Sequence, residues 1–80
     1  MATKHDEIHD SNSVLAHAAD DEPLFILCAR DRTAIPVIGV WITIAEFAGI
    51  PKKKIANAIR LRDMMLSWQS IHPEKLKMPD

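Results

Sequence analysis

Three consecutive lysines, Lys52, Lys53 and Lys54, follow the chain-breaking sequence Gly-Ile-Pro at 49–51. Proline suits the first position of a helix, so the lysines are expected in the first turn of a helix that begins at Pro51. A helix N-terminus carries about half a positive charge and presents free N–H groups, which together attract anions. Each added lysine would cost about 0.3–1 kcal/mol of helix stability unless an anion offsets it. The cluster is therefore a candidate anion site, and the alternative is a set of lysines extended into water.

Other basic residues could contribute to such a site. Arg30 and Arg32 flank Asp31 at an expected strand-to-helix turn and could bind phosphate through both guanidinium nitrogens, or Asp31 could cap the helix while both arginines face water. Arg62 and Gln69 fall on the apolar face of the last helix, where a charge is either paired or lies at a wet interface. Alternatively, Arg62 extends along the helix edge to water. The predicted anion-binding residues are Lys52, Lys53, Lys54, Arg30, Arg32 and Arg62.

Catalysis and metal binding have little support in the sequence. His5, Asp6, His9 and Asp10 form an H-D-x-x-H-D pattern, but a structural zinc site needs about four ligands and this segment is acidic and aperiodic. The chain has two glycines, which is too few for a glycine-rich phosphate loop. Cys28 lies in an apolar run, where a buried thiol is inert. We expect no catalytic residues, no metal, no cofactor and no enzymatic activity.

The charge is divided unevenly along the 80 residues. Residues 1–22 carry one lysine against six acidic residues, a net charge of −5, and residues 23–80 carry nine Lys and Arg against five acidic residues, a net charge of +4. This asymmetry predicts an acidic disordered arm at 1–22 and a single basic domain at 23–80. A short helix over 13–19, capped by Ser13, is possible within the arm.

The rest of the composition suggests a small cytoplasmic protein. One cysteine allows no intrachain disulfide, and no secretory signal is apparent. The longest apolar stretch, residues 34–50, has 17 residues, whereas a membrane span needs about 20. We therefore expect a cytoplasmic location and no membrane partner.

The order of the expected elements is strand, helix, helix. Residues 24–29, LFILCA, are typical of a buried strand, and because no second strand candidate exists, its partner is expected from another copy. A helix capped by Asp31 or Thr33 should run to about Ala48 and stop at Gly49; it is apolar on every side and should be buried by partner subunits. The last helix should run from Pro51 to about Ser70. The fold class is thus small α+β, a β-α-α protomer that forms a homo-oligomer through Leu24, Phe25, Ile26, Leu27, Trp41 and Gln69.

Residues 43–59, TIAEFAGIPKKKIANAI, resemble the helix-turn-helix of bacterial repressors. That motif has a small residue four positions before the turn glycine and apolar residues one, six and nine positions after it. The matching residues are Ala45, Gly49, Ile50, Ile55 and Ala58. The resemblance implies a recognition helix that faces DNA with Lys52, Lys53, Lys54 and Asn57.

Residues 23–80 resemble a group of short bacterial and phage proteins. The shared pattern is an apolar strand ending in Ala-x-Asp, a Trp in the next helix, G-x-P-x-x-K, and a Met three residues before a Trp. It is carried here by Ala29, Asp31, Trp41, Gly49, Pro51, Lys54, Met65 and Trp68, with Pro79-Asp80 at the end. The resemblance implies a compact strand–helix–helix unit and a phage-accessory setting, and it implies no activity.

Together these features predict a small non-catalytic binding protein of phage-accessory type. It would inhibit a host defence by sequestering an anionic, nucleotide-like ligand or by blocking a defence protein. The alternative is a helix-turn-helix protein that binds DNA.

Overall fold

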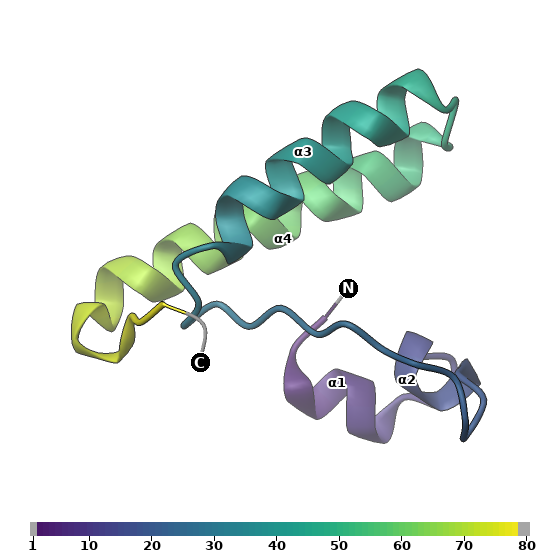
Figure 1. Ribbon diagram of the computed structural model, residues 1–80, viewed down its shortest axis with the longest axis horizontal. Coiled ribbons are helices and arrows are strands. Elements are labelled where there is room, and N and C mark those ends of the chain that lie inside the picture. The colour runs from purple at the N-terminus through teal and green to yellow at the C-terminus, as the bar shows by residue number, and fades with distance from the viewer. Residues whose placement is uncertain (1, 79–80) are drawn as a thin grey trace.

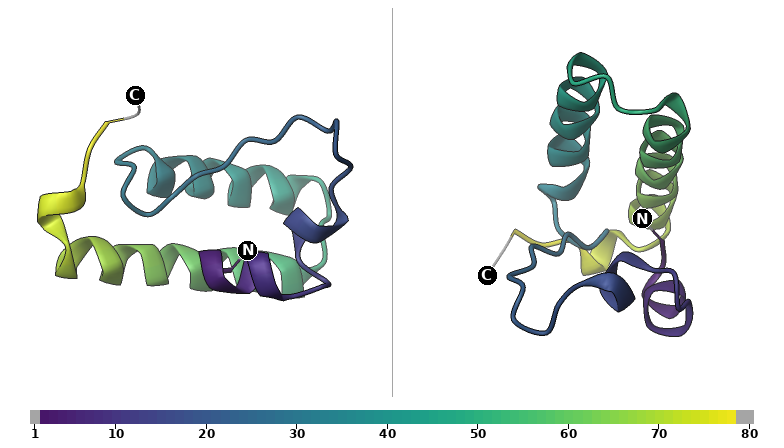
Figure 2. Two further views of the ribbon diagram at one scale, coloured as in Figure 1. Left: turned by 90° about the horizontal axis from the view of Figure 1, so that it is seen from below. Right: turned by 90° about the vertical axis from the view of Figure 1, so that its right-hand side faces the viewer.

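The computed structural model describes residues 2–78, and these residues are mostly helical. In chain order the elements are α1 (Lys4–His9), α2 (Val14–His17), α3 (Ala34–Phe47), α4 (Lys52–Ile71) and the short 3₁₀ helix η1 (Pro73–Lys75). The two long helices, α3 and α4, lie side by side and antiparallel, while α1 and α2 form a smaller unit apart from them (Figures 1 and 2). Pro79 and Asp80 lie outside the described residues.

The predicted α+β fold with a β-α-α protomer is wrong. Residues 24–29 have no regular secondary structure, and within residues 2–78 the only β-pairing is one isolated bridge between Asp31 and Lys77. An extended segment becomes a strand only when a neighbouring strand takes up its backbone hydrogen bonds, and the helices of this chain offer none. The segment instead connects α2 to α3 as an open linker, with Phe25 85% exposed.

The two predicted helices are present, and three of their four ends lie within one residue of the predicted position. Asp31 Oδ1 accepts hydrogen bonds from the backbone N–H and the hydroxyl of Thr33, both at 2.7 Å, which orders the chain just before α3. At the other end, Gly49 adopts φ +73°, Gly49 N–H donates to Glu46 O, and Ile50 N–H donates to Ala45 O. This is the pattern of a Schellman motif, so Gly49 stops the helix as predicted.

The core lies between α3 and α4 and consists mainly of small side chains. The buried apolar residues are Ala34, Ile42 and Ala45 from α3 and Ala58 and Met65 from α4. Alanines at the contact let two helices approach closely, which favours dispersion contacts between their backbones and side chains. The expectation that α3 is buried all round is not met within one chain, because Val40, Ile44 and Phe47 are 60%, 60% and 91% exposed.

The open end of the hairpin is closed by the linker and the C-terminal segment. Arg32 N–H donates to Lys77 O and Lys77 N–H donates to Arg30 O, both at 3.0 Å. The side-chain amide of Gln69 donates to Ala29 O at 2.9 Å. These bonds fix residues 29–32 against Gln69 of α4 and against Lys77 in the C-terminal segment, although residues 24–28 remain an open connection.

Two short helices, α1 and α2, form within the segment that was expected to be a disordered arm. The division of the chain into an arm at 1–22 and a domain at 23–80 stays a prediction. Thr3 and Asp6 form a reciprocal capping box at the start of α1, and Ser13 caps α2 as the sequence suggested. Ser13 is buried, and its hydroxyl donates to Glu7 O at 2.8 Å, which joins the two helices. Among the described residues, α1 and α2 make no contact with α3 or α4.

Residues 2–78 contain no helix that combines the length and the apolar character needed to cross a membrane.

Candidate anion-binding site

The lysine cluster lies at the turn between the two long helices. Lys52, Lys53 and Lys54 are all exposed, and they occupy the first turn of α4 as predicted. Pro51 stands at the N-cap and contributes no side-chain hydrogen bond, and the first turn contains no acidic residue. Nothing in the helix therefore neutralises the positive helix end.

The three ammonium groups of this cluster and two of its backbone N–H groups have no partner within the described part of the chain. No ion pair involves any of the three lysines. Lys54 N–H donates to Pro51 O at 2.9 Å, whereas the N–H groups of Lys52 and Lys53 have no backbone acceptor. Free N–H groups beside three ammonium groups are the arrangement that binds a phosphate or carboxylate.

The two predicted arginines of the strand-to-helix turn are found at the opposite end of the hairpin. Arg30 and Arg32 are exposed and precede α3, while the lysine cluster follows it (Figure 1). The 14 residues of α3 span about 21 Å. One small anion therefore cannot touch both groups within a single chain.

Arg62 and Gln69 both lie on the side of α4 that turns toward α3 and the linker. Arg62 is half-buried, and its Nε is 4.0 Å from Oδ1 of the mostly exposed Asp63, a long contact that contributes little to stability. Gln69 is half-buried and uses its amide nitrogen for the bond to Ala29. The bond to Ala29 explains why Gln69 lies on an apolar face. The predicted roles of Arg62 in anion binding and of Gln69 in an oligomer interface stay predictions.

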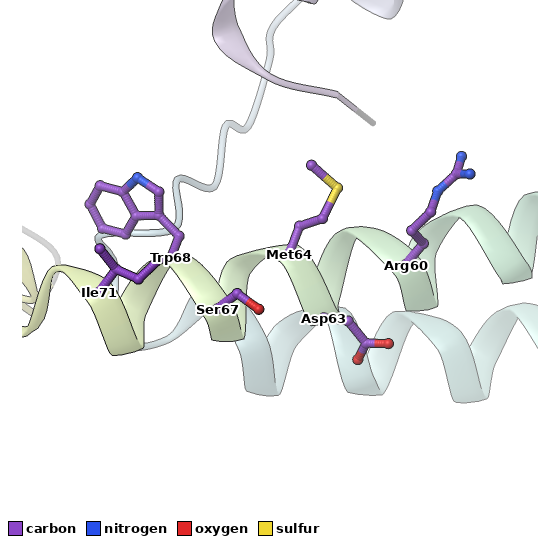
Figure 3. A pocket seen from close by; sticks show the side chains of 6 residues that line it. All are labelled: Arg60, Asp63, Met64, Ser67, Trp68 and Ile71. Atoms are coloured by element: carbon purple, nitrogen blue, oxygen red, sulfur yellow. The ribbon is translucent and has the colours of Figure 1, made fainter.

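A second surface was not singled out from the sequence. A shallow open hollow on the outward side of α4 is lined by Arg60, Asp63, Met64, Ser67, Trp68 and Ile71 (Figure 3). Trp68 is placed by its ring contact with His72, at 4.6 Å between centroids, and by the Lys75 ammonium 5.9 Å from its ring. The sequence did contain a signal, because apolar residues at 64, 68 and 71 are spaced four and three apart and share a helix face.

The residues considered for metal and thiol chemistry occupy exposed positions. The rings of His5 and His9 stack at 4.2 Å in α1, and His9 Nδ1 lies 2.8 Å from His5 O. Within residues 2–78, no three His, Cys, Asp or Glu side chains gather where they could hold a metal ion. Cys28 is exposed because the linker is open, which corrects the expectation of a buried thiol.

No family model, curated protein or solved structure matches the chain.

Proposed function

We propose that the protein is a small non-catalytic binding protein of phage-accessory type that inhibits a host defence by sequestering an anionic, nucleotide-like ligand. The observation that carries the proposal is the first turn of α4, where three exposed lysines and two free backbone N–H groups surround an uncapped helix end. Placing positive charge there opposes the helix dipole, and a bound anion would remove that penalty. The phage-accessory setting rests on the sequence resemblance over residues 23–80.

DNA binding is the second candidate, and the arrangement of the helices supports it less well. In a helix-turn-helix the two helices cross at about 90–120° and the second helix offers its face to the major groove. Here α3 and α4 run side by side (Figure 2), so the inner face of α4 is covered by α3. The lysines are gathered at the tip of the hairpin instead of along an open helix face.

Substitution of the lysines tests the proposal, because stability and binding should change in opposite directions. Lys52→Glu and Lys53→Glu should raise the free energy of unfolding by about 0.3–1 kcal/mol, since a carboxylate suits a helix N-terminus. The same changes should weaken binding of the ligand at least about tenfold, because each removes an attractive charge and adds a repulsive one. The measurements are thermal melts beside titrations with mononucleotides, cyclic dinucleotides and duplex DNA at two salt concentrations.

Lys4→Glu is the matched control. Lys4 is the first residue of α1, as Lys52 is of α4, so the substitution makes the same change of charge at a helix start in the separate N-terminal unit. At the higher salt concentration, where the charge of the N-terminal unit is screened, it should leave ligand binding unchanged. If the logarithm of the affinity for duplex DNA falls with the logarithm of the salt concentration at a slope of about 0.9 per phosphate contact, the result would favour the DNA-binding alternative. If the protein binds none of the probes and the Lys→Glu variants still inhibit the host defence fully, the anion site is excluded. The remaining hypothesis is then that the protein blocks a defence protein.

A further inference from the structure

One face of α3 is exposed, apolar and uncharged along its whole length. Val37, Val40, Ile44 and Phe47 are 40%, 60%, 60% and 91% exposed, and they point away from the side that packs on α4. Their spacing of three, four and three residues places them in one stripe, the repeat by which helices pack on helices. The only charged residue of α3, Glu46, lies outside this α3 stripe.

The chain exposes more surface than folded monomers of its mass usually do. A folded chain of 9.0 kDa exposes about 4,900 Å², whereas this chain exposes 6377 Å². The excess of about 1,500 Å² comes from the linker and the N-terminal unit as well as α3, and it exceeds the roughly 800 Å² per partner of a standard interface. No large side chain is fully buried in the described residues, so the single chain has an incomplete core.

We propose that the α3 stripe is the interface with a second copy of this chain, and that the two α3 helices pair antiparallel about a two-fold axis at the level of Ile42. In that register Val40 faces Ile44 of the partner subunit, and Val37 faces Phe47 of the partner subunit. Both pairs are centred on position 42, so the stripe is complementary to itself, as a two-fold interface requires. Each outer pair sets a small side chain against a large one, which lets the two surfaces interdigitate.

Charge selects the antiparallel arrangement over the parallel one. A parallel pair would bring both lysine clusters, three residues from each chain, to the same end, whereas an antiparallel pair holds them about 20 Å apart. Each cluster then lies at the same end as residues 30–32 of the partner subunit, whose net charge is only +1 because Asp31 stands between the two arginines. Charge also argues against a lipid surface as the occupant of the stripe. Helices that lie on membranes carry Lys and Arg on their polar face, and α3 contains neither.

The pairing has a consequence for the anion site, and this consequence rests on the proposed function. The start of α3 in one copy comes level with the end of α3 in the other. Arg30 and Arg32 of the partner subunit therefore lie at the same end of the pair as Lys52, Lys53 and Lys54. The two basic groups that one chain separates thus gather at each end of a dimer, where an extended anion with more than one phosphate could contact both.

Charged substitutions in the stripe test the interface and its direction together. Wild type should behave in light scattering and sedimentation as two copies of 9.0 kDa or an even multiple. Val40→Glu and Ile44→Lys should each raise the dissociation constant about a hundredfold or more, because each places an unpaired charge at the centre of the interface. The double variant Val40→Glu/Ile44→Lys sets each Glu against a Lys of the partner in the antiparallel register. It should associate at least about tenfold more tightly than either single variant.

Ala56→Glu is the control, because it adds the same charge at an exposed alanine of α4 and should leave association unchanged. If a single variant does not fold, disulfide cross-linking tests the interface instead. In a Cys28→Ser background, a mixture of Val37→Cys and Phe47→Cys chains should form a disulfide-linked dimer, and either chain alone should not, because positions 37 and 37 of an antiparallel pair are about 15 Å apart.

Several results would overturn the proposal. A wild-type particle of 9.0 kDa at all concentrations excludes any self-association. Unchanged association in Val40→Glu, with dissociation in Phe25→Asp, assigns the interface to the linker. The antiparallel register is excluded if the double variant associates as weakly as the single variants. It is also excluded if each cysteine variant forms a disulfide-linked dimer with itself. If the dimer forms as expected but binds none of the anions, the result supports the interface and contradicts the proposed ligand.

Discussion

The α3–α4 hairpin and the N-terminal unit of α1 and α2 are held together in different ways. The hairpin buries apolar side chains between two long helices, with Ala34, Ala45 and Ala58 at the contact. The N-terminal unit has no buried residue in either helix and depends on hydrogen bonds around Ser13 and on the Thr3 capping box. A capping bond contributes about 1 kcal/mol, while a buried contact surface sums over many atoms. The difference teaches that the hairpin should resist unfolding as one cooperative body and the N-terminal unit should open locally.

The largest effect is expected from a charge placed between the long helices. Ala58 is fully buried, so Ala58→Asp buries a carboxylate without a partner and should lower the free energy of unfolding by about 3 kcal/mol or more. That is a large share of the roughly 4–12 kcal/mol expected for 80 residues. Ala56→Asp makes the same change two residues earlier at an exposed site and should alter stability by about 0.5 kcal/mol at most. Equal effects of the two substitutions in urea unfolding would contradict the contact between α3 and α4.

The two glycines of the chain offer a sharper test of how the hairpin turns. A methyl group would meet no atom within 4 Å at either Gly39 or Gly49, so packing is the same in both cases. Gly49 has φ +73°, and Gly49→Ala should destabilise the protein by about 1–2 kcal/mol through backbone strain. Gly39 is inside α3, and Gly39→Ala should stabilise by about 0.5–1 kcal/mol. In chemical denaturation the two variants should change the free energy of unfolding in opposite directions. A stabilising Gly49→Ala would exclude a left-handed conformation of Gly49 at the turn.

Sequence reasoning succeeded where local chemistry decides the structure. Gly49 and Pro51 mark the break between the two helices whatever the rest of the chain does, and the helix ends therefore agree with the prediction. It failed at residues 24–29, because an apolar run forms a strand only beside a second strand, and without one this segment is an open linker with Phe25 85% exposed. Composition alone did not indicate α1, because local bonds from the side chains of Thr3 and Glu7 contribute to the short N-terminal helices.

The candidate site was predictable in part for the same reason. The exposure of the lysine cluster follows from its place in the first helical turn, which the sequence reveals. The separation of Arg30 and Arg32 from the lysines depends on the antiparallel return of α4, which is a tertiary feature. The α3 stripe could not be identified from the sequence, because the whole helix is apolar and only its packing on α4 shows which side is exposed.

Gln69 connects the linker to the hairpin and allows a test of that junction. Gln69→Ala removes the bond to Ala29 and leaves its half-buried carbonyl without a donor, so stability should fall by about 1 kcal/mol. The amides of Arg32 and Lys77, which bond across the same junction, should then exchange hydrogen faster. Ser70→Ala is the control, because it removes only a local bond to Leu66 within α4. If hydrogen exchange at Arg32 is unchanged in Gln69→Ala, the backbone hydrogen bonds between residues 30–32 and Lys77 hold the linker without the glutamine.

The smallest effect is expected when the N-terminal unit is removed altogether. Since α1 and α2 do not contact α3 or α4 in the described residues, deletion of residues 1–20 should leave the melting temperature of the hairpin within about 2 °C of the intact chain. In a domain of this size, 1 kcal/mol corresponds to about 4–8 °C, so even one lost capping interaction would be visible if the two parts were coupled. Ser13→Ala in the full chain is the companion variant. It should cost about 1 kcal/mol locally, seen as faster hydrogen exchange at Ala16, again without a shift in the main transition. Loss of cooperative melting in the truncated chain would mean that the N-terminal unit is part of the folded core. The deletion also removes four acidic residues and one lysine, so binding of an anion at the lysine cluster should tighten, and more so at low salt.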